Sequence, residues 1–241
     1  TMVTTSSVSE LFILSAENIL SEISIDAPNG YSVSIDNQYF DSSVSFIPEI
    51  TNQIYVRFEP SDVTSYYSTL VISSSEINSN INIILFGLGI PLVHNYQAFQ
   101  DQALGFGGGF SQSANQVFML HDDITNIEQI KMYLQIDCPS TGCDDWDRFA
   151  NVKVKDPSTG DWYEIARYIT PYWVGTQQLD RGLEFDVTDF KYYLTGSTEL
   201  RIYIENWTAK ADLVTIEFDY VEGTPDYPFY AVSEVLGLHS N

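Results

Sequence analysis

The sequence is short of positive charge, histidine, cysteine and long apolar runs. Its 241 residues include 10 Lys and Arg against 33 Asp and Glu, which gives a formal net charge of −23. A chain this acidic cannot neutralise a phosphate backbone, so nucleic acid is excluded as a partner. An anionic membrane surface would repel it as well. No apolar run approaches the roughly 20 residues of a membrane span, so no membrane partner is expected.

What is abundant points to a folded protein. Aromatic residues make up 14% of the chain, with 4 Trp, 16 Tyr and 14 Phe, whereas disordered segments contain few aromatics. A chain of 241 residues is long enough for one large or two ordinary domains with a buried core. The composition therefore predicts a folded, anionic protein.

The two cysteines bear on the cellular compartment. They lie in the turn-rich segment Cys138-Pro-Ser-Thr-Gly-Cys143, where the spacing suits a small disulfide loop or a pair of free thiols. The disulfide is the favoured interpretation and is typical of an oxidising compartment. A zinc site would need two more ligands nearby, and none is present. Residues 1–10 lack the basic and apolar regions of a signal peptide, as a mature secreted chain would.

Short strand signals dominate the chain. Alternating or β-branched stretches recur about every 8–12 residues, a spacing typical of antiparallel β-sandwiches and jelly rolls. A helix is expected only as one or two turns within Asp186–Leu194. The predicted fold is all-β, and its predicted strands include Ser32–Ile35, Gln53–Phe58, Ser68–Ser73, Asn80–Phe86, Gln129–Ile136, Asn151–Val154, Glu199–Ile204 and Val214–Tyr220.

A domain boundary is predicted near residue 91. Residues 1–90 contain no Lys, His, Cys or Trp, and all the Trp and both Cys follow. The first part closes with the strand Ile83–Gly89, before Pro91. Together with the earlier motif Val56-Arg-Phe-Glu-Pro60, this layout resembles immunoglobulin-like (Ig-like) modules of the abnormal-spindle/hydin type, which commonly act as spacers or docking domains. The predicted domains are an Ig-like β-sandwich at 1–91, with no sign of chemistry, and a second domain at 92–241.

The segment Cys143-Asp-Asp-Trp-Asp-Arg-Phe149 is the first candidate site. It places three carboxylates, Trp146 and Arg148 beside the cysteines. Carboxylates this close repel one another, which raises the pKa of at least one of them unless Arg148 or hydrogen bonds compensate. Groups with shifted pKa values are candidates for acid–base chemistry. A calcium-binding loop, or an acidic loop that is simply solvated, is the alternative interpretation.

The segment Arg201-Ile-Tyr-Ile-Glu-Asn-Trp207 is the second candidate site, because it reads as a strand with two different faces. With a period of two, Tyr203, Glu205 and Trp207 share one face, and two isoleucines point to the other. A row of ring, carboxylate and ring suits a sugar, whose apolar face stacks on aromatic rings while its hydroxyls seek acceptors. The alternative is that Trp207 only caps the edge of the sandwich.

The aromatic tract Trp162–Trp173 is the third candidate. A strand with alternating burial explains Ile165 and Ile169, but it does not explain the number of rings. A carbohydrate or peptide cleft would explain them, and so would a domain interface.

Other familiar kinds of site are not indicated. His94, His121 and His239 are far apart in the sequence and not at ligand spacing, so no metal site is predicted. No Gly-x-Ser-x-Gly motif is present, which argues against a serine nucleophile. Asn206-Trp-Thr208 is formally a glycosylation sequon. Because it lies in a predicted strand, we attribute its occurrence to chance.

A series of motifs along the second domain carries a family resemblance. In order they resemble the bacterial peptide:N-glycosidase F family, the amidases that release intact N-linked glycans from asparagine. The match runs from about Phe106 to Ala231, a little over half of the chain. The motifs are Phe106-Gly-Gly-Gly-Phe-Ser-Gln-Ser113, Cys138-Pro-Ser-Thr-Gly-Cys-Asp-Asp-Trp-Asp-Arg148, Asn151-Val-Lys-Val-Lys155, Ile169-Thr-Pro-Tyr-Trp-Val-Gly175, Arg181-Gly-Leu-Glu184, Asp186-Val-Thr-Asp-Phe-Lys191, Tyr203-Ile-Glu-Asn-Trp207 and Gly223-Thr-Pro-Asp-Tyr227.

The resemblance implies a fold and a reaction. The family fold is two eight-stranded jelly rolls side by side with the active site in the cleft between them, and residues 92–241 correspond to the first jelly roll. The implied reaction is hydrolysis of the glycan–asparagine amide of an N-linked glycoprotein or glycopeptide, with no cofactor and no metal. The implied location is secreted, periplasmic or on the bacterial cell surface. The implied site residues are Asp147 and Glu205 as catalytic carboxylates, Arg148, Trp207 and Trp146 as substrate-binding residues, and Cys138 and Cys143 as a disulfide.

The sequence also departs from the family, because it ends at Asn241. The second jelly-roll domain, expected to complete the site, is not in the chain, and neither is another family carboxylate. An open half-cleft loses the dry setting that such a site needs, so weak activity or none is expected of the chain alone. The alternative function is a non-catalytic module that binds glycans or proteins. A purely structural protein is a third possibility, against which Asp147, Arg148, Glu205 and Trp207 all argue.

Overall fold

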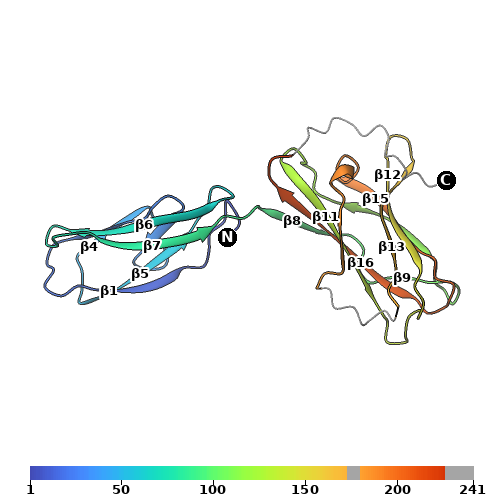
Figure 1. Cartoon of the computed structure of the whole chain (residues 1–241), viewed down its shortest axis with the longest axis horizontal. Coiled ribbons are helices and arrows are strands. Elements are labelled where there is room, and N and C mark those ends of the chain that lie inside the picture. Colours follow the sequence, from blue (N-terminus) through green and yellow to red (C-terminus); the bar gives the residue numbers. More distant parts are fainter. Residues whose placement is uncertain (173–179, 226–241) are drawn as a thin grey trace. The chain divides into compact units, whose positions relative to one another are not determined.

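The computed structural model describes residues 1–172 and 180–225 of the chain. These residues form an almost entirely β structure (Figure 1), so the all-β prediction is confirmed. The chain divides into two compact units after Leu92, one residue beyond the boundary predicted from the sequence. Trp173 and the ends of the motifs that reach Gly175 and Tyr227 lie outside the described residues, as does His239. No helix among the described residues is long and apolar enough to cross a membrane.

Unit 1, residues 1–92, is built from two antiparallel sheets around one core. The strand orders are β1-β5-β3 and β4-β2-β6-β7. Alternation places apolar side chains of both sheets inward, and Ile25, Val33, Ile54 and Leu70 are completely buried between them. The relationship of this sandwich to Ig-like modules stays a prediction. Its strands are β1 (Glu10–Ser15), β2 (Ile23–Asp26), β3 (Tyr31–Ser34), β4 (Ser43–Phe46), β5 (Thr51–Phe58), β6 (Ser65–Ser74) and β7 (Ile81–Leu88).

A glycine in β7 lets an aromatic ring approach the strand closely. A Cβ atom at Gly87 would lie 2.6 Å from the ring of Phe58. That ring is held by Tyr31 and Tyr66, with centroids at 4.9 and 5.1 Å. Gly87 is therefore required by the packing of this aromatic cluster.

Unit 2, which begins at Val93, also has two antiparallel sheets around a shared core. One sheet has the order β10-β15-β12-β13, and the other has the order β14-β11-β16-β8 with β9 also on β16. Because β8 and β9 pair with successive parts of β16, they fill one edge together, and each sheet has four strand positions. This matches the eight-stranded arrangement expected from the sequence. The elements are β8 (Val93–Gln97), β9 (Gln102–Leu104), β10 (Ser113–Met119), β11 (Ile127–Asp137), β12 (Phe149–Lys155), β13 (Trp162–Ile169), β14 (Leu183–Asp186), the single-turn 3₁₀ helix η1 (Thr188–Phe190), β15 (Ser197–Ile204) and β16 (Asp212–Glu222).

A β-bulge in β13 changes which side chains face outward. Val152 pairs with Ala166, but the next residue, Lys153, pairs with Glu164, so one extra residue of β13 has no partner. A bulge reverses the facing of the residues that follow. It therefore brings Glu164 and Arg167, three residues apart, to the same outer face of the sheet, where their side chains form an ion pair of 2.6 Å.

The same bulge overturns one expectation about burial. Ile165 is buried as predicted, but Ile169 is exposed. Simple alternation assumed an unbroken strand, whereas the irregular pairing turns Ile169 outward with Arg167.

Candidate active site

The two carboxylates expected to be catalytic come to one edge of the four-stranded sheet. Asp147 lies two residues before the start of β12, and Glu205 immediately follows the end of β15. Because β12 and β15 are antiparallel neighbours, the start of one lies beside the end of the other. The Glu205 N–H donates a hydrogen bond of 2.8 Å to the Phe149 carbonyl oxygen, which fixes this juxtaposition.

Arg148 lies among these acidic groups, and its hydrogen bonds to Asp144 and Thr170 fix its position. Its Nε donates a hydrogen bond of 2.5 Å to Asp144 Oδ2, and the Asp144 side chain is almost fully buried. Its backbone N–H donates to Thr170 Oγ1 at 2.8 Å. The pKa of Arg148 is raised, chiefly by the Asp144 hydrogen bond and further by the charges of Asp144, Glu205 and Asp147. Arg148 thus offsets the negative charge of the whole cluster.

The disulfide between Cys138 and Cys143 is present, with Cα atoms 5.1 Å apart. The disulfide interpretation is therefore confirmed, and the free-thiol alternative is wrong. It closes a short loop whose last cysteine precedes Asp144 directly. Closing such a loop reduces the freedom of the unfolded chain and fixes the start of the segment that carries Asp144 and Arg148.

A buried asparagine holds the turn that carries Glu205 and Trp207. Asn206 is fully buried. Its Oδ1 accepts hydrogen bonds from the Thr208 N–H at 2.8 Å and the Thr208 hydroxyl at 2.9 Å. Its Nδ2 donates to the Lys210 carbonyl at 2.8 Å and to Asp212 Oδ2 at 3.1 Å. The amide of this formal sequon is therefore occupied in the interior. The strand position expected for Asn206 is wrong, because β15 ends at Ile204 and Asn206 lies in the turn that follows.

Asp212 is an acidic group of this region that the sequence did not indicate. Its side chain is buried, and its Oδ1 has no hydrogen-bond partner. Burial raises its pKa to about 6, with a further rise from the charge of Asp144, against the Asn206 hydrogen bond and the charge of Arg148, which lower it. A carboxyl group shifted in this way holds a proton at mildly acidic pH. The sequence pointed instead to the acidic run at 144–147, where Arg148 compensates Asp144.

Exposed aromatic rings stand beside both carboxylates. Trp207, two residues after Glu205, is 54% exposed and lies 5.2 Å from the ring of Phe106. Trp146, next to Asp147, is 57% exposed and lies 5.8 Å from the ring of Tyr172. Large rings held open to solvent in pairs are suited to stacking on a ligand. The structure therefore brings Asp147, Arg148 and Glu205 to one edge of the sheet, and an exposed tryptophan lies close in the chain to each of the two carboxylates.

The face assignment is confirmed only for the part of the segment that lies in β15. The strand ends at Ile204, so Glu205 and Trp207 lie in the turn that follows it and not in the strand as expected. Ile202 and Ile204 are fully buried, while Tyr203 is partly exposed on the other side. Burial raises the pKa of the Tyr203 hydroxyl, and the negative charge of Glu205 raises it further. Tyr203 and Glu205 are thus electrostatic neighbours.

Two of the histidines lie side by side in the fold, although their sequence spacing did not suggest it. The rings of His94 and His121, far apart in the chain, stack with centroids 4.5 Å apart. His94 Nε2 lies 2.7 Å from Glu222 Oε1, and His121 Nδ1 lies 2.9 Å from the Tyr96 hydroxyl. In residues 1–172 and 180–225, however, no three His, Cys, Asp or Glu side chains converge in a way that would hold a metal ion.

Comparison with known proteins gives strong matches. The chain is 53% identical over 142 residues to peptide-N(4)-(N-acetyl-beta-D-glucosaminyl)asparagine amidase F of Elizabethkingia miricola, a match that covers 59% of this chain and 40% of that protein. Unit 1 contains only residues 1–92, so a match of this length must include part of unit 2. No protein-family model matches the chain.

Solved structures agree with the sequence match. The structure of PNGase F, a glycosylasparaginase from Flavobacterium meningosepticum, is similar with a TM-score of 0.55 and 52% identity. It covers 57% of this chain and 44% of that one. A structure of recombinant peptide:N-glycanase F gives the same values. The chain therefore spans less than half the length of the relatives it matches.

Proposed function

We propose, from the homology of about 59% of this chain to the PNGase F family, that it is an amidase-type protein acting on N-linked glycoproteins or glycopeptides. The bond cleaved is the amide between the asparagine side chain and the first sugar. Water adds its oxygen to the side-chain carbonyl, which leaves aspartate, and the nitrogen departs with the glycan as a glycosylamine that later loses ammonia. The observation that carries the proposal is the convergence of Asp147, Arg148 and Glu205 at one sheet edge, in a chain with this degree of identity.

Each site residue has a role that its position supports. Asp147 is exposed at the edge of the sheet, where it can orient or deprotonate the attacking water. Glu205, with Tyr203 beside it, would hold the core N-acetylglucosamine or direct the proton to the departing nitrogen. Arg148, fixed by Asp144, would stabilise the clustered negative charge during the reaction. Trp207 and Trp146 would stack on the substrate.

The second jelly-roll domain of the family is proposed to complete this site. The edge that carries Asp147 is open in unit 2, and a dry environment strengthens the electrostatic interactions on which such a reaction depends. The short relative length of the chain therefore leads us to expect low activity from the chain alone. The disulfide supports a location outside the cytoplasm, which is secreted, periplasmic or on the bacterial cell surface.

The test is incubation of the chain with a denatured N-glycopeptide, with mass spectrometry of the peptide product. Conversion of Asn to Asp that is absent in Asp147→Asn is the expected result, slow for the chain alone. Equal conversion by Asp147→Asn would contradict the assignment. Unchanged far-UV circular dichroism of the variant is the control for folding.

The exposed ring pairs favour a second candidate, a glycan-binding module. If no conversion occurs, titration of the same sample with the free glycan decides between the two. Tight binding that is lost in Trp207→Ala would identify a binding module. Absence of both conversion and binding would contradict both functions.

A further inference from the structure

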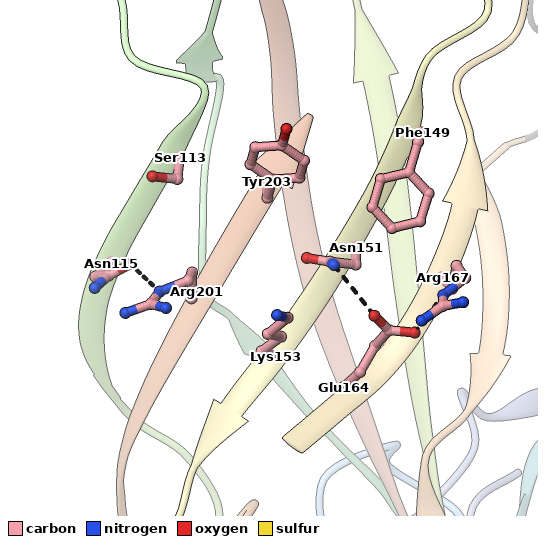
Figure 2. A pocket seen from close by; sticks show the side chains of 9 residues that line it. All are labelled: Ser113, Asn115, Phe149, Asn151, Lys153, Glu164, Arg167, Arg201 and Tyr203. Atoms are coloured by element: carbon pink, nitrogen blue, oxygen red, sulfur yellow. Dashed lines mark hydrogen bonds and ion pairs between the residues drawn. The ribbon is translucent and has the colours of Figure 1, made fainter. Parts of the chain in front are cut away.

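The outer face of the four-stranded sheet in unit 2 carries a pocket of about 450 Å³, within the usual range for small-ligand sites of roughly 300–1,000 Å³. Figure 2 shows its walls, with Tyr203 and Phe149 at one end and Arg201, Lys153 and Glu164 toward the other. The residues that line it are Ser113, Asn115, Phe149, Asn151, Lys153, Glu164, Arg167, Arg201 and Tyr203.

The strand register explains how these residues meet. One row runs across all four strands through Asn115, Arg201, Lys153 and Glu164, and the neighbouring row runs through Ser113, Tyr203, Asn151 and Arg167. The β13 bulge is needed for this arrangement, because an unbroken strand would send Glu164 and Arg167 to opposite faces.

The pocket gathers positive charge in a strongly acidic protein. Three of the chain's ten Lys and Arg residues line it, together with a single carboxylate, that of Glu164. Burial lowers the pKa of Lys153, Glu164 raises it, and the charges of Arg201 and Arg167 lower it, so the three cations act on one another. A concave, locally positive surface attracts an anion even when the whole chain is negative.

The polar side chains of the pocket are fixed by hydrogen bonds to one another. Glu164 is 2% exposed and bonds both Arg167 Nε at 2.6 Å and Asn151 Nδ2 at 3.1 Å. Asn151 is 5% exposed, and its Oδ1 has no hydrogen-bond partner. A buried acceptor without a partner costs stability unless a donor reaches it, and a ligand hydroxyl in the pocket would supply that donor.

The guanidinium of Arg201 is oriented for a ligand as well. It lies 4.0 Å from the centre of the Trp162 ring, and its Nε donates to Asn115 Oδ1 at 2.9 Å. These two contacts fix its plane and leave its terminal nitrogens for a carboxylate, which guanidinium groups bind in a bidentate manner.

We propose that this pocket binds a sugar that carries a carboxylate, such as a hexuronic acid or a sialic acid, with its ring against the Tyr203 and Phe149 pair, whose ring centroids lie 6.3 Å apart, and its carboxylate toward Arg201 and Lys153. A sugar ring in contact with the aromatic pair, a hydroxyl that donates to Asn151 Oδ1 and a carboxylate among the cations match the three properties of the lining. Because Phe149 follows Arg148 and Tyr203 neighbours Glu205, the pocket continues from the proposed amidase edge. The inference deepens the proposed function by naming an acidic sugar as part of the glycan, but its test requires no turnover.

The experiment is titration of the full chain, in an Asp147→Asn background, with glucuronate, sialate, glucose and inorganic sulfate, followed by ¹H–¹⁵N NMR. Glucuronate or sialate is expected to bind at least about tenfold more tightly than glucose or sulfate, since charge-assisted hydrogen bonds and ring contacts act together. Arg201→Gln and Lys153→Gln should each weaken this binding about tenfold.

Lys155→Gln is the matched control. Lys155 is the next outward residue of β12, pairs with Glu199 at 2.7 Å and does not line the pocket, so this variant should change affinity by less than about twofold. The proposal is overturned if sulfate or glucose binds as tightly as the acidic sugars, if Lys155→Gln is as damaging as Arg201→Gln, or if no acidic sugar binds. These experiments measure binding without turnover in the Asp147→Asn background. Their results can therefore be interpreted even if the amidase proposal fails.

Discussion

Unit 1 and unit 2 share an architecture but differ in what their outward faces carry. Both bury alternating apolar residues between antiparallel sheets. Unit 1 exposes Tyr67, Ile84 and Phe86 on neighbouring strands β6 and β7, whereas unit 2 presents Asn151, Lys153 and Arg201 on a comparable sheet. The inward positions of the two units are alike. Candidate functional side chains therefore lie on the outward face and at the strand ends of a β-sandwich, and they can differ while the core stays the same.

The largest expected effect tests whether the catalytic residues lie only in unit 2. Glu205→Gln should lower the rate of Asn-to-Asp conversion by roughly 10²–10⁴-fold, the size of a general acid–base contribution. The matched substitution Glu59→Gln removes a carboxylate in unit 1 that pairs with Arg57 and should leave the rate unchanged. Rates are read by mass spectrometry of the peptide product. A comparable loss in Glu59→Gln would show that unit 1 takes part in the reaction.

The next effect contrasts a buried ion pair with a surface one. Arg148→Met leaves the buried carboxylate of Asp144 without its partner and should reduce the stability of unit 2 by about 3 kcal/mol. Arg57→Met breaks the more exposed pair with Glu59 in unit 1 and should cost less than about 1 kcal/mol. All four Trp follow residue 92, so tryptophan fluorescence during urea unfolding reports unit 2, and far-UV circular dichroism reports both units. Equal losses in the two variants would remove the contrast.

A pH effect due to Asp212 should appear in the stability of unit 2. The pKa of Asp212 is raised to about 6 in the folded protein, above about 3.9 for an unfolded aspartate. The folded state therefore binds this proton more tightly, and the resulting stability is fully present below about pH 4 and lost as the pH rises through about 6. The effect is on the order of 2–3 kcal/mol. In Asp212→Asn, the fluorescence-detected stability should lose this pH dependence, and an unchanged profile would contradict the assignment to Asp212.

The smallest effect belongs to the core of unit 1. Gly87→Ala places a Cβ atom 2.6 Å from the Phe58 ring and should destabilise unit 1 by about 1–2 kcal/mol through overpacking. Circular dichroism should detect this change, while the tryptophan transition of unit 2 stays where it was. A shift of both transitions would mean that the two units unfold together.

Much of the fold follows from strand alternation, and the exceptions have physical causes. β15 was predicted because its isoleucines alternate with polar residues. β1 was not, because this edge strand keeps Leu11 and Ile13 on its exposed side, so that its sequence shows no alternation. The bulge of β13 could not be read from a period of two, since one unpaired residue leaves no mark in composition.

The candidate site, like the fold, could be predicted from the sequence only in part. Asp147, Glu205 and Trp207 could be proposed from the sequence because unusual residue types are close together there. Asp212 could not be proposed, and Asn206 was noted only as a sequon, because the burial of both residues and their contact across a turn are properties of the fold. The pocket under Arg201 depends on the register of four strands, and a one-dimensional pattern does not contain register.

The burial of Asn206 has a consequence for how the protein is produced. A glycosylating enzyme meets Asn206-Trp-Thr208 on the emerging chain, before the turn has folded, and a host with such an enzyme modifies sequons of this kind. A glycan on Nδ2 would replace one of the two hydrogens that bond Lys210 and Asp212, and it could not enter the interior. Expression in a eukaryotic secretory pathway would therefore set folding in competition with modification. Any molecule that lost this competition would carry, at the turn beside its own Glu205, the kind of linkage that the protein is proposed to cleave.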